Sequence, residues 1–277
     1  MNMDDLHRAL PSTSDSEKVY TFKNPYPQHF SLPYPIIKYM IENPQSGEVW
    51  KKLIMTCKHF YSKKSIFPVG SLEIVCNIKG KADGEYFDSS LPFPKLWVYQ
   101  SLQSEDSAAD EVAPLIPKVS KFDLRILKIQ NQRLTWNDYQ KLTSSGTLEE
   151  LCLEDIVIGD ADGTIVAYDK LLQSLPHLEV IEMACFHGYL EFEPDTVKKM
   201  VDLLSGCKKL RRLKLDGLEE NFDFASFANF LLKNEIVDIC FIYYDPVSDA
   251  YKEMIHALIE EIGKNPALKV PEVIFLE

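Results

Sequence analysis

Apolar residues recur in one short phrase along residues 65–277: an apolar residue, two variable residues, an apolar residue, one variable residue and a further apolar residue. Alternation of this kind is typical of a short strand with one buried face. Eight copies occur, and they begin at Val69, Phe93, Leu124, Leu148, Leu178, Leu210, Ile236 and Val270. Recurrence at intervals of 24 to 34 residues indicates stacked units that share one core.

The segments between these phrases predict helices. Four of them have apolar residues at three- and four-residue spacing, namely residues 168–176, 194–208, 224–234 and 249–266. Strands that alternate with helices favour a parallel sheet in an α/β fold. A doubly wound α/β domain is the alternative, but no glycine-rich phosphate loop follows any of the expected strands.

The repeated unit resembles that of leucine-rich-repeat proteins, whose consensus begins L-x-x-L-x-L. The best copies are TLEELCLEDIVI (147–158), HLEVIEM (177–183) and KLRRLKLDGL (209–218). The resemblance implies a leucine-rich-repeat solenoid of about eight irregular repeats over residues 67–277, with parallel strands on the concave face and helices on the convex face. The usual Asn or Cys after the third apolar position is replaced by Gln132, Ile156, Phe186 and Leu218, so the turns must satisfy their backbone groups in another way.

A different apolar pattern occupies residues 31–61. The first part has helical spacing with Pro33 in the first turn, and its apolar residues are Leu32, Ile36, Ile37, Met40 and Ile41. Residues 43–47 (NPQSG) break this helix. A second apolar stripe follows at Val49, Leu53, Cys57 and Phe60. Two helices this short cannot bury all of their apolar surface against each other, so another element or molecule must cover the remainder.

This second pattern resembles the F-box, which has a leading Leu-Pro, paired aliphatic residues, a turn, and a helix ending in Val-Cys-Lys-x-Trp. Leu32-Pro33, Ile36-Ile37 and Cys57-Lys58 match, whereas Pro35 replaces the common Glu and Phe60 the common Trp. The whole chain is similar to the divergent, nematode-type proteins that join an F-box to leucine-rich repeats. Three segments are expected: a disordered lead-in at 1–28, a small all-α F-box-like module at 29–66, and the repeats at 67–277.

The resemblance implies a substrate receptor of an SCF-type E3 ubiquitin ligase. The F-box-like helices would bind the Skp-family adaptor of the cullin ligase through Leu32, Pro33, Ile36, Ile37, Met40, Val49, Leu53 and Phe60. In the alternative interpretation the chain is a stand-alone repeat protein, and these helices only cap the open end of the stack.

Charge and composition limit the kinds of partner and the cellular location that the chain can have. The net charge of −12 disfavours binding to nucleic acid or to an anionic membrane surface. Residues 31–64 hold six lysines against two glutamates, and this local charge of +4 suits an acidic partner. The sequence shows no secretory signal, and no apolar run is long enough for a membrane span. Six widely spaced cysteines fit a reduced compartment, so a cytoplasmic or nuclear location is expected.

The concave face is the expected site for a target protein of unknown identity. The variable residue between the second and third apolar positions points there, because side chains alternate along a strand. Trp97 and Tyr99 form an aromatic pair of the kind enriched in binding hot spots, although a core position for Trp97 is the alternative. The other candidates give this face mixed charge: Lys128, Glu150, Glu154, Glu182, Arg212, Lys214 and Asp216.

No pattern in the chain predicts an enzyme, a metal site or a cofactor. The loop GDADGT (159–164) lacks the ligand spacing of a calcium-binding EF-hand. The histidines have no nucleophile at a recognisable spacing, so no catalytic group can be assembled from the sequence. An α/β enzyme without recognisable motifs is the remaining alternative to the two binding functions.

Overall fold

The structure is a computed structural model, and it describes residues 32–75, 79–105, 107–185, 192, 195–233, 236–244 and 247–276. The lead-in expected at residues 1–28 lies outside the described residues. The chain forms two compact units, Met1–Asn43 and Pro44–Glu277. This division falls inside the range 29–66 that the sequence assigned to one helical module.

The first unit contributes one described helix, and the second contributes the sheet and the other helices. The helices are α1 (Tyr34–Glu42), α2 (Gly47–Thr56), α3 (Lys58–Lys63), α4 (Trp136–Thr143), α5 (Tyr168–Leu172), α6 (Thr196–Gly206), α7 (Phe224–Leu231) and α8 (Asp249–Gly263), with a short 3-10 helix η2 (Ile116–Lys118). The strands are β1 (Ile66–Val75), β2 (Lys79–Ala82), β3 (Glu85–Asp88), β4 (Lys95–Ser104), β5 (Val119–Phe122), β6 (Ile126–Thr135), β7 (Glu150–Gly159), β8 (Val180–Ala184), β9 (Arg212–Leu218), β10 (Asp238–Tyr243) and β11 (Glu272–Phe275).

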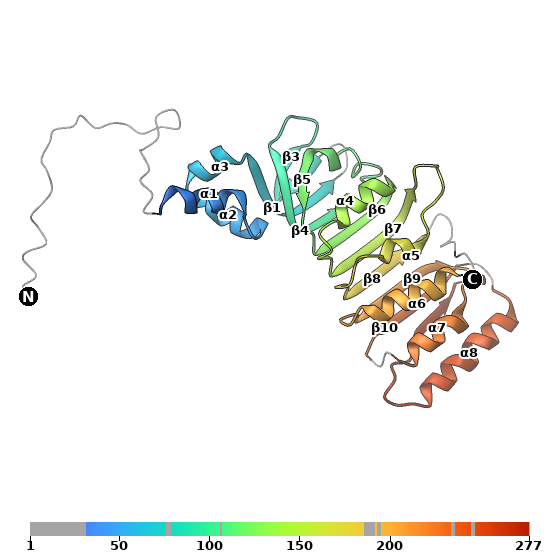
Figure 1. Cartoon of the computed structure of the whole chain (residues 1–277). Coiled ribbons are helices and arrows are strands. Elements are labelled where there is room, and N and C mark those ends of the chain that lie inside the picture. The colour runs from blue at the N-terminus through green and yellow to red at the C-terminus, as the bar shows by residue number, and fades with distance from the viewer. Residues whose placement is uncertain are drawn as a thin grey trace, which may run out of the picture. The chain divides into compact units, whose positions relative to one another are not determined.

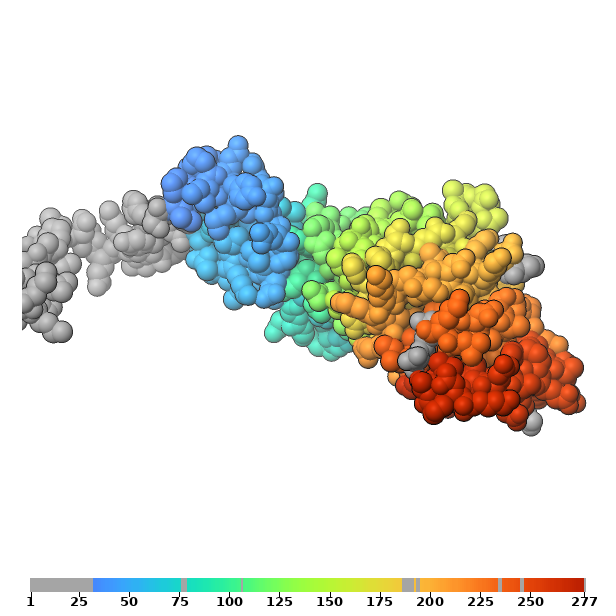
Figure 2. Space-filling model, turned by 60° about the horizontal axis from the view of Figure 1, so that its bottom comes forward, coloured from blue at the N-terminus to red at the C-terminus, as the bar shows by residue number. Residues whose placement is uncertain are grey.

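The second unit is a mixed α/β structure with an open, mostly parallel sheet. The strand order is β11-β10-β9-β8-β7-β6-β4-β1-β2-β3, and β5 pairs with β4 off this path. Among the described strands, β2 and β3 alone pair antiparallel, β2 with β1 and β3 with β2. Neighbouring parallel strands follow chain order (Figure 1), so the described sheet lacks the reversal of strand order that defines a doubly wound fold. In the space-filling view the segments of the second unit also follow one another in chain order, from light blue through green and yellow to red (Figure 2).

The predicted apolar phrase forms a continuous core from β6 to β10. Its second residue stands in register across five strands, at Leu127, Leu151, Ile181, Leu213 and Ile239, and all five side chains are buried. Helices α4 to α8 lie along one face of these strands (Figure 1), and their buried residues belong to the same apolar cluster. All four predicted helices are present, as α5, α6, α7 and α8.

Two of the eight phrases are correct as strands but wrong in register. In β4 the residue that aligns with Leu127 is Leu102, whereas Leu96, the second residue of the predicted phrase, lies six residues earlier and pairs with Phe67 of β1 and Val119 of β5. In β11, Val273 aligns with Phe241 of β10, which is the third apolar position. The polar position of the repeat is therefore occupied by Gln103 in β4 and by Glu272 in β11.

The turn that follows the phrase recurs as well. Two residues after the third apolar residue, Asn131, Asp155 and Gly217 have φ values of 55°, 49° and 93°. Asn, Asp and Gly are the residues that enter the left-handed region most readily. At the next position the buried Gln132 bonds to the loop before β5: its Oε1 accepts from the N–H of Val112 at 2.9 Å, and its Nε2 donates to the carbonyl of Ala108 at 2.6 Å.

We expect Gln132→Leu to lower the free energy of unfolding by about 2 kcal/mol or more, because two buried backbone groups lose their partners. Gln140→Leu, on the exposed side of α4, is the matched control and should change this free energy by less than about 0.5 kcal/mol. Urea titration followed by circular dichroism measures both. Equal effects of the two substitutions would show that Gln132 does not hold this loop.

Helices α2 and α3 are attached to the first strands of the sheet. Trp50 is fully buried, and its Nε1 donates to the carbonyl of Ile66 at 2.9 Å. A Cβ on Gly47 would come within 2.4 Å of the Tyr99 ring, so only glycine allows this close approach of α2 to β4.

The β2–β3 hairpin also holds α2: the carboxylate of Asp83 bonds to Lys51 of α2 and accepts a hydrogen bond from the N–H of Gly70 in β1. Asp83 and Gly84, both with positive φ, form the two-residue turn of the β2–β3 hairpin, a signal that the repeat pattern did not include.

Candidate functional site

Helix α1 presents most of its predicted adaptor-binding side chains to solvent. Leu32, Pro33 and Ile36 are exposed, Ile36 by 47%, and Met40 is half-buried. Ile37 is only 4% exposed, so it belongs to the buried side of α1 together with Ile41. The apolar face of this helix therefore divides into an exposed part and a buried part.

The other predicted adaptor-binding residues, on α2 and α3, also differ in their exposure. Val49 is exposed, Leu53 is half-buried and Phe60 is buried. The sequence placed all of them on one apolar stripe, but the most buried residue of α2 is Trp50, which meets the sheet one position further on. Phe60 packs edge-on against Trp50, with ring centroids 6.4 Å apart, and thus holds α3 against α2.

The sequence missed three exposed side chains on these helices. Tyr34 and Tyr39 on α1 and Met55 on α2 are each at least 66% exposed. The signal for Tyr39 was available, because it lies three residues after Ile36 and shares its helix face. Ser46 begins α2 by accepting a hydrogen bond from the N–H of Val49 at 3.2 Å, which fixes the start of the helix after the NPQSG break.

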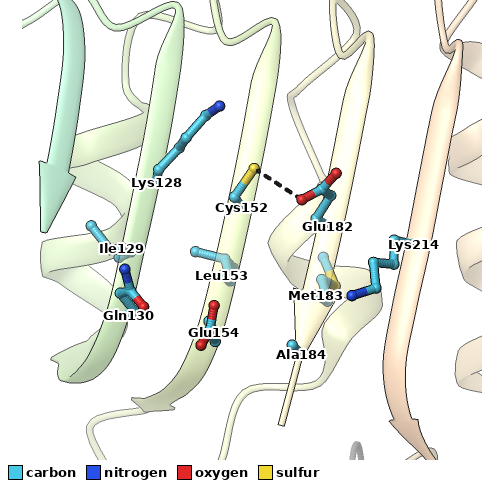
Figure 3. A pocket seen from close by; sticks show the side chains of 10 residues that line it. All are labelled: Lys128, Ile129, Gln130, Cys152, Leu153, Glu154, Glu182, Met183, Ala184 and Lys214. Carbon is cyan, nitrogen blue, oxygen red and sulfur yellow. Dashed lines mark hydrogen bonds between the residues drawn. The ribbon is translucent and has the colours of Figure 1, made fainter. Parts of the chain in front are cut away.

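On the sheet, most of the predicted target-binding residues gather on the face opposite helices α4 to α8, which we call the open face. Its central row is Lys128, Cys152, Glu182 and Lys214, one from each of β6 to β9. These four side chains line a cavity of about 220 Å³ together with Glu154 and Ala184 (Figure 3). The structure places Lys128, Glu154, Glu182 and Lys214 around this one cavity because their strands are in register.

The charged side chains of the open face are joined by ion pairs. Lys128 pairs with Glu150 at 2.9 Å, Arg212 with Glu182 at 2.9 Å, and Lys214 with Asp216 at 2.8 Å. The hydrogen bond that Lys128 donates to the Glu150 carboxylate holds the pKa of Lys128 above its ordinary value. Burial, with a smaller contribution from the nearby Glu182 carboxylate, raises the pKa of the Cys152 thiol to about 11, so this cysteine stays protonated at neutral pH.

Trp97 and Tyr99 require a correction. Trp97 is 2% exposed, its Nε1 donates to Asp123 at 2.8 Å, and the ammonium groups of Lys64 and Lys121 lie over its ring. The register of β4 explains this position, since Trp97 lies before the row that contains Lys128 and pairs with Pro68 and Lys121 instead. Trp97 is therefore a buried residue, as the alternative interpretation of the sequence held, and it is not presented for binding. Tyr99 is half-buried beside Gly47, where α2 begins.

The part of the chain that the structure describes holds no metal-binding cluster. No three His, Cys, Asp or Glu side chains among those residues are placed to hold a metal ion. Within the same ranges, every helix is too short or too polar to cross a membrane. No protein-family model matches the chain, and no curated protein matches it. The function must therefore be argued from the geometry of α1, α2 and the open face.

Proposed function

We propose that this protein is a substrate receptor of an SCF-type ubiquitin ligase, which binds the Skp-family adaptor through α1 and α2 and a target protein through the sheet. The observation that carries the proposal is the concentration of exposed apolar side chains near the start of the described chain. Of the fifteen exposed large apolar side chains among the described residues, seven lie within residues 32–67: Leu32, Tyr34, Ile36, Tyr39, Val49, Met55 and Phe67. Such side chains are expected where a partner covers them.

Charge supports an acidic partner at the same helices. Residues 31–64 carry a net charge of +4 on a chain whose total is −12. Two of these lysines form only exposed ion pairs within their own helix, Lys38 with Glu42 and Lys52 with Glu48, and exposed pairs of this kind are weak. An acidic adaptor would gain from this local excess mainly in its rate of association and in its orientation.

The receptor role includes the proposal that the repeat body is a leucine-rich-repeat solenoid with an accessible strand face. The aligned apolar phrases, the recurring left-handed residue and the bonds of Gln132 to the loop backbone support this assignment. The open face would be the concave face of the solenoid, and it would bind the target. The protein would carry no chemistry itself and would act by raising the concentration of its target near the ligase.

The alternative of a stand-alone repeat protein is favoured by one specific observation. Trp50, Lys51 and Gly47 attach α2 to β1, β4 and the β2–β3 hairpin, as a cap for the first strands would require. A capping role for α2 does not account for the exposed side chains of α1. We therefore assign α2 both a capping role and an adaptor-docking role, and we assign α1 the docking role alone.

Co-elution in size-exclusion chromatography tests the proposal. The purified full chain and a purified Skp-family adaptor, mixed at equal concentration, should elute as a 1:1 complex ahead of either protein alone. Separate elution at micromolar concentrations, with both proteins folded by circular dichroism, would favour the stand-alone repeat protein.

A further inference from the structure

A cavity of about 340 Å³ lies between the starts of β1 and β4, the β2–β3 hairpin and α2, all within the second unit. Its lining contains four aromatic rings and two branched aliphatic side chains: Phe67, Tyr86, Phe87, Phe93, Val69 and Leu96. Volumes of about 300–1,000 Å³ and predominantly apolar linings are typical of ligand-binding sites in proteins. Neither the adaptor-docking role of α1 and α2 nor the open face accounts for this cavity.

The cavity arises because β1 is followed by a hairpin, whereas the later strands are followed by helices. Each crossover between consecutive strands from β6 to β11 contains one of the helices α4 to α8, which covers the apolar face of the sheet. The described part of the crossover from β1 to β4 contains the strands β2 and β3 and no helix. Val69 and Leu96 are buried in the same apolar cluster as the residues beneath those helices, so the apolar face continues here without a helix over it.

The walls of the cavity are held in place by contacts with the rest of the second unit. Phe87 and Phe93 meet edge-on, with ring centroids 5.3 Å apart. The ammonium group of Lys118 lies 5.7 Å from the centroid of the Phe93 ring. The hairpin is tied to β1, because Asp83 accepts a hydrogen bond from the N–H of Gly70 at 2.8 Å. The cavity is therefore formed before a ligand binds, which lowers the cost of binding.

The apolar surface extends from the cavity onto its rim. Phe67 is 42% exposed and Tyr86 is 69% exposed, although both line the cavity. A small molecule inside the cavity would leave much of these two rings in water. A helix that lies across the rim would cover them while one of its side chains fills the cavity.

One charge at the cavity is available to a partner. Lys51 and Asp83 both line the cavity, but they pair with each other. Glu85 of the hairpin also lines it, is exposed and forms no ion pair within the described residues. A cation next to the apolar side chain that enters the cavity would therefore meet an opposite charge.

We propose that this cavity binds an amphipathic helix of a basic partner protein, which takes the place that α4 to α8 take over the later strands. One large apolar side chain of the helix enters the cavity between Phe87, Phe93 and Leu96. A Lys or Arg three or four residues away on the same side of the helix reaches Glu85. The site goes beyond the proposed function, because the expected adaptor is acidic and the open face lies on the opposite side of the sheet.

Fluorescence anisotropy with a labelled Leu-Lys peptide of about 18 residues, long enough to form a helix, tests this proposal on the full chain. Its leucines recur at three- and four-residue spacing, so they share one side of the helix. We expect this peptide to bind at least about tenfold more tightly than a peptide of the same composition in scrambled order. A Leu-Glu peptide with the same spacing should also bind at least about tenfold more weakly, because Glu85 would repel it.

Two substitutions at the rim locate the binding. Tyr86→Ala should weaken binding of the Leu-Lys peptide by about tenfold, and the exposure of Tyr86 makes a loss of folding unexpected. Ile165→Ala, at a loop position that is 66% exposed, is the matched control and should change binding by less than about twofold. Glu85→Gln should weaken binding by about threefold, and Glu260→Gln on the exposed side of α8 should leave it unchanged.

Equal affinities of the ordered and scrambled peptides, or of the Leu-Lys and Leu-Glu peptides, would overturn the proposal. Unchanged affinity in Tyr86→Ala would overturn it as well. Binding of naphthalene by a chain that binds none of the peptides would assign the cavity to a small apolar ligand, and self-association that Tyr86→Ala abolishes would assign it to a second copy; either result overturns the proposal. Adaptor binding should be unchanged in Tyr86→Ala, so absence of adaptor binding with retained peptide binding contradicts only the proposed function.

Discussion

Replacing Trp50 by alanine is expected to lower the free energy of unfolding by about 3–5 kcal/mol, the usual cost of removing a fully buried aromatic side chain. The indole is completely buried, donates to the Ile66 carbonyl and contacts the Phe60 ring, so its loss leaves both a cavity and an unpaired carbonyl. Because Trp50 joins α2 to the sheet and Phe60 joins α3 to α2, both helices should lose their attachment.

Urea titration of Trp50→Ala measures this loss, and Trp136→Ala is the matched control. Trp136 is half-buried at the start of α4 and stacks on Tyr139, so its removal should cost clearly less. If Trp50→Ala unfolds within about 1 kcal/mol of the unchanged protein, α2 is not built into the sheet as described.

Ile36→Asp is expected to weaken binding of the Skp-family adaptor by about 30-fold or more, the size of a hot-spot effect. Ile36 is 47% exposed on α1, so the charge would enter the proposed interface without entering a core. The stability of the chain should change by less than about 0.5 kcal/mol. Isothermal titration of the adaptor into the two proteins measures the affinities, and thermal unfolding measures the stability.

The choice of a single substitution at Ile36 follows from the burial of its neighbour. Ile37 is 4% exposed, so a charge there would disturb packing and would leave the cause of any lost binding ambiguous. Ile165→Asp makes the same chemical change at an exposed loop position, where the isoleucine is 66% exposed, and should bind the adaptor normally. Equal adaptor affinities of Ile36→Asp and Ile165→Asp would show that Ile36 of α1 does not contact the adaptor.

The sequence predicted the body of the sheet well because one phrase determines both the strand and its buried face. From β6 to β10, Leu127, Leu151 and Leu213 are buried and aligned as the spacing requires. Helices α5 to α8 were predicted for a similar reason, since their apolar spacing reflects the same core. A one-dimensional pattern is sufficient where each repeat packs mainly against its neighbours.

The predicted register was wrong in β4, where two apolar groups fit the repeated phrase. Strand β4 buries Leu96 and Val98 near its start and Leu102 near its end, so two apolar groups compete for the place of the phrase. The pairing of Leu96 with Val119 of β5 and of Leu102 with Leu127 of β6 decides between them, and no local pattern shows this pairing. The position of Trp97 follows from this choice, which is why it is buried beside Asp123 rather than presented on the open face.

The docking face of α2 could not be predicted from local spacing either. Helical spacing in the sequence gave one apolar stripe through Val49 and Leu53, whereas the sheet meets the turn that carries Gly47 and Trp50. Periodicity identifies an amphipathic helix, but the face that docks depends on the partner surface. The Asp83-Gly84 hairpin could have been predicted from its turn residues, and it positions the carboxylate that binds Lys51.

Hydrogen exchange of the full chain, with and without a saturating Skp-family adaptor, tests the central claim most directly. The account predicts slower exchange of the backbone amides of Tyr34–Glu42, with Gly47–Thr56 protected to a lesser extent because α2 is already packed on the sheet. It also predicts unchanged exchange in the strands that carry the open face, from β6 to β10. Protection confined to those strands, or none in Tyr34–Glu42, would contradict it.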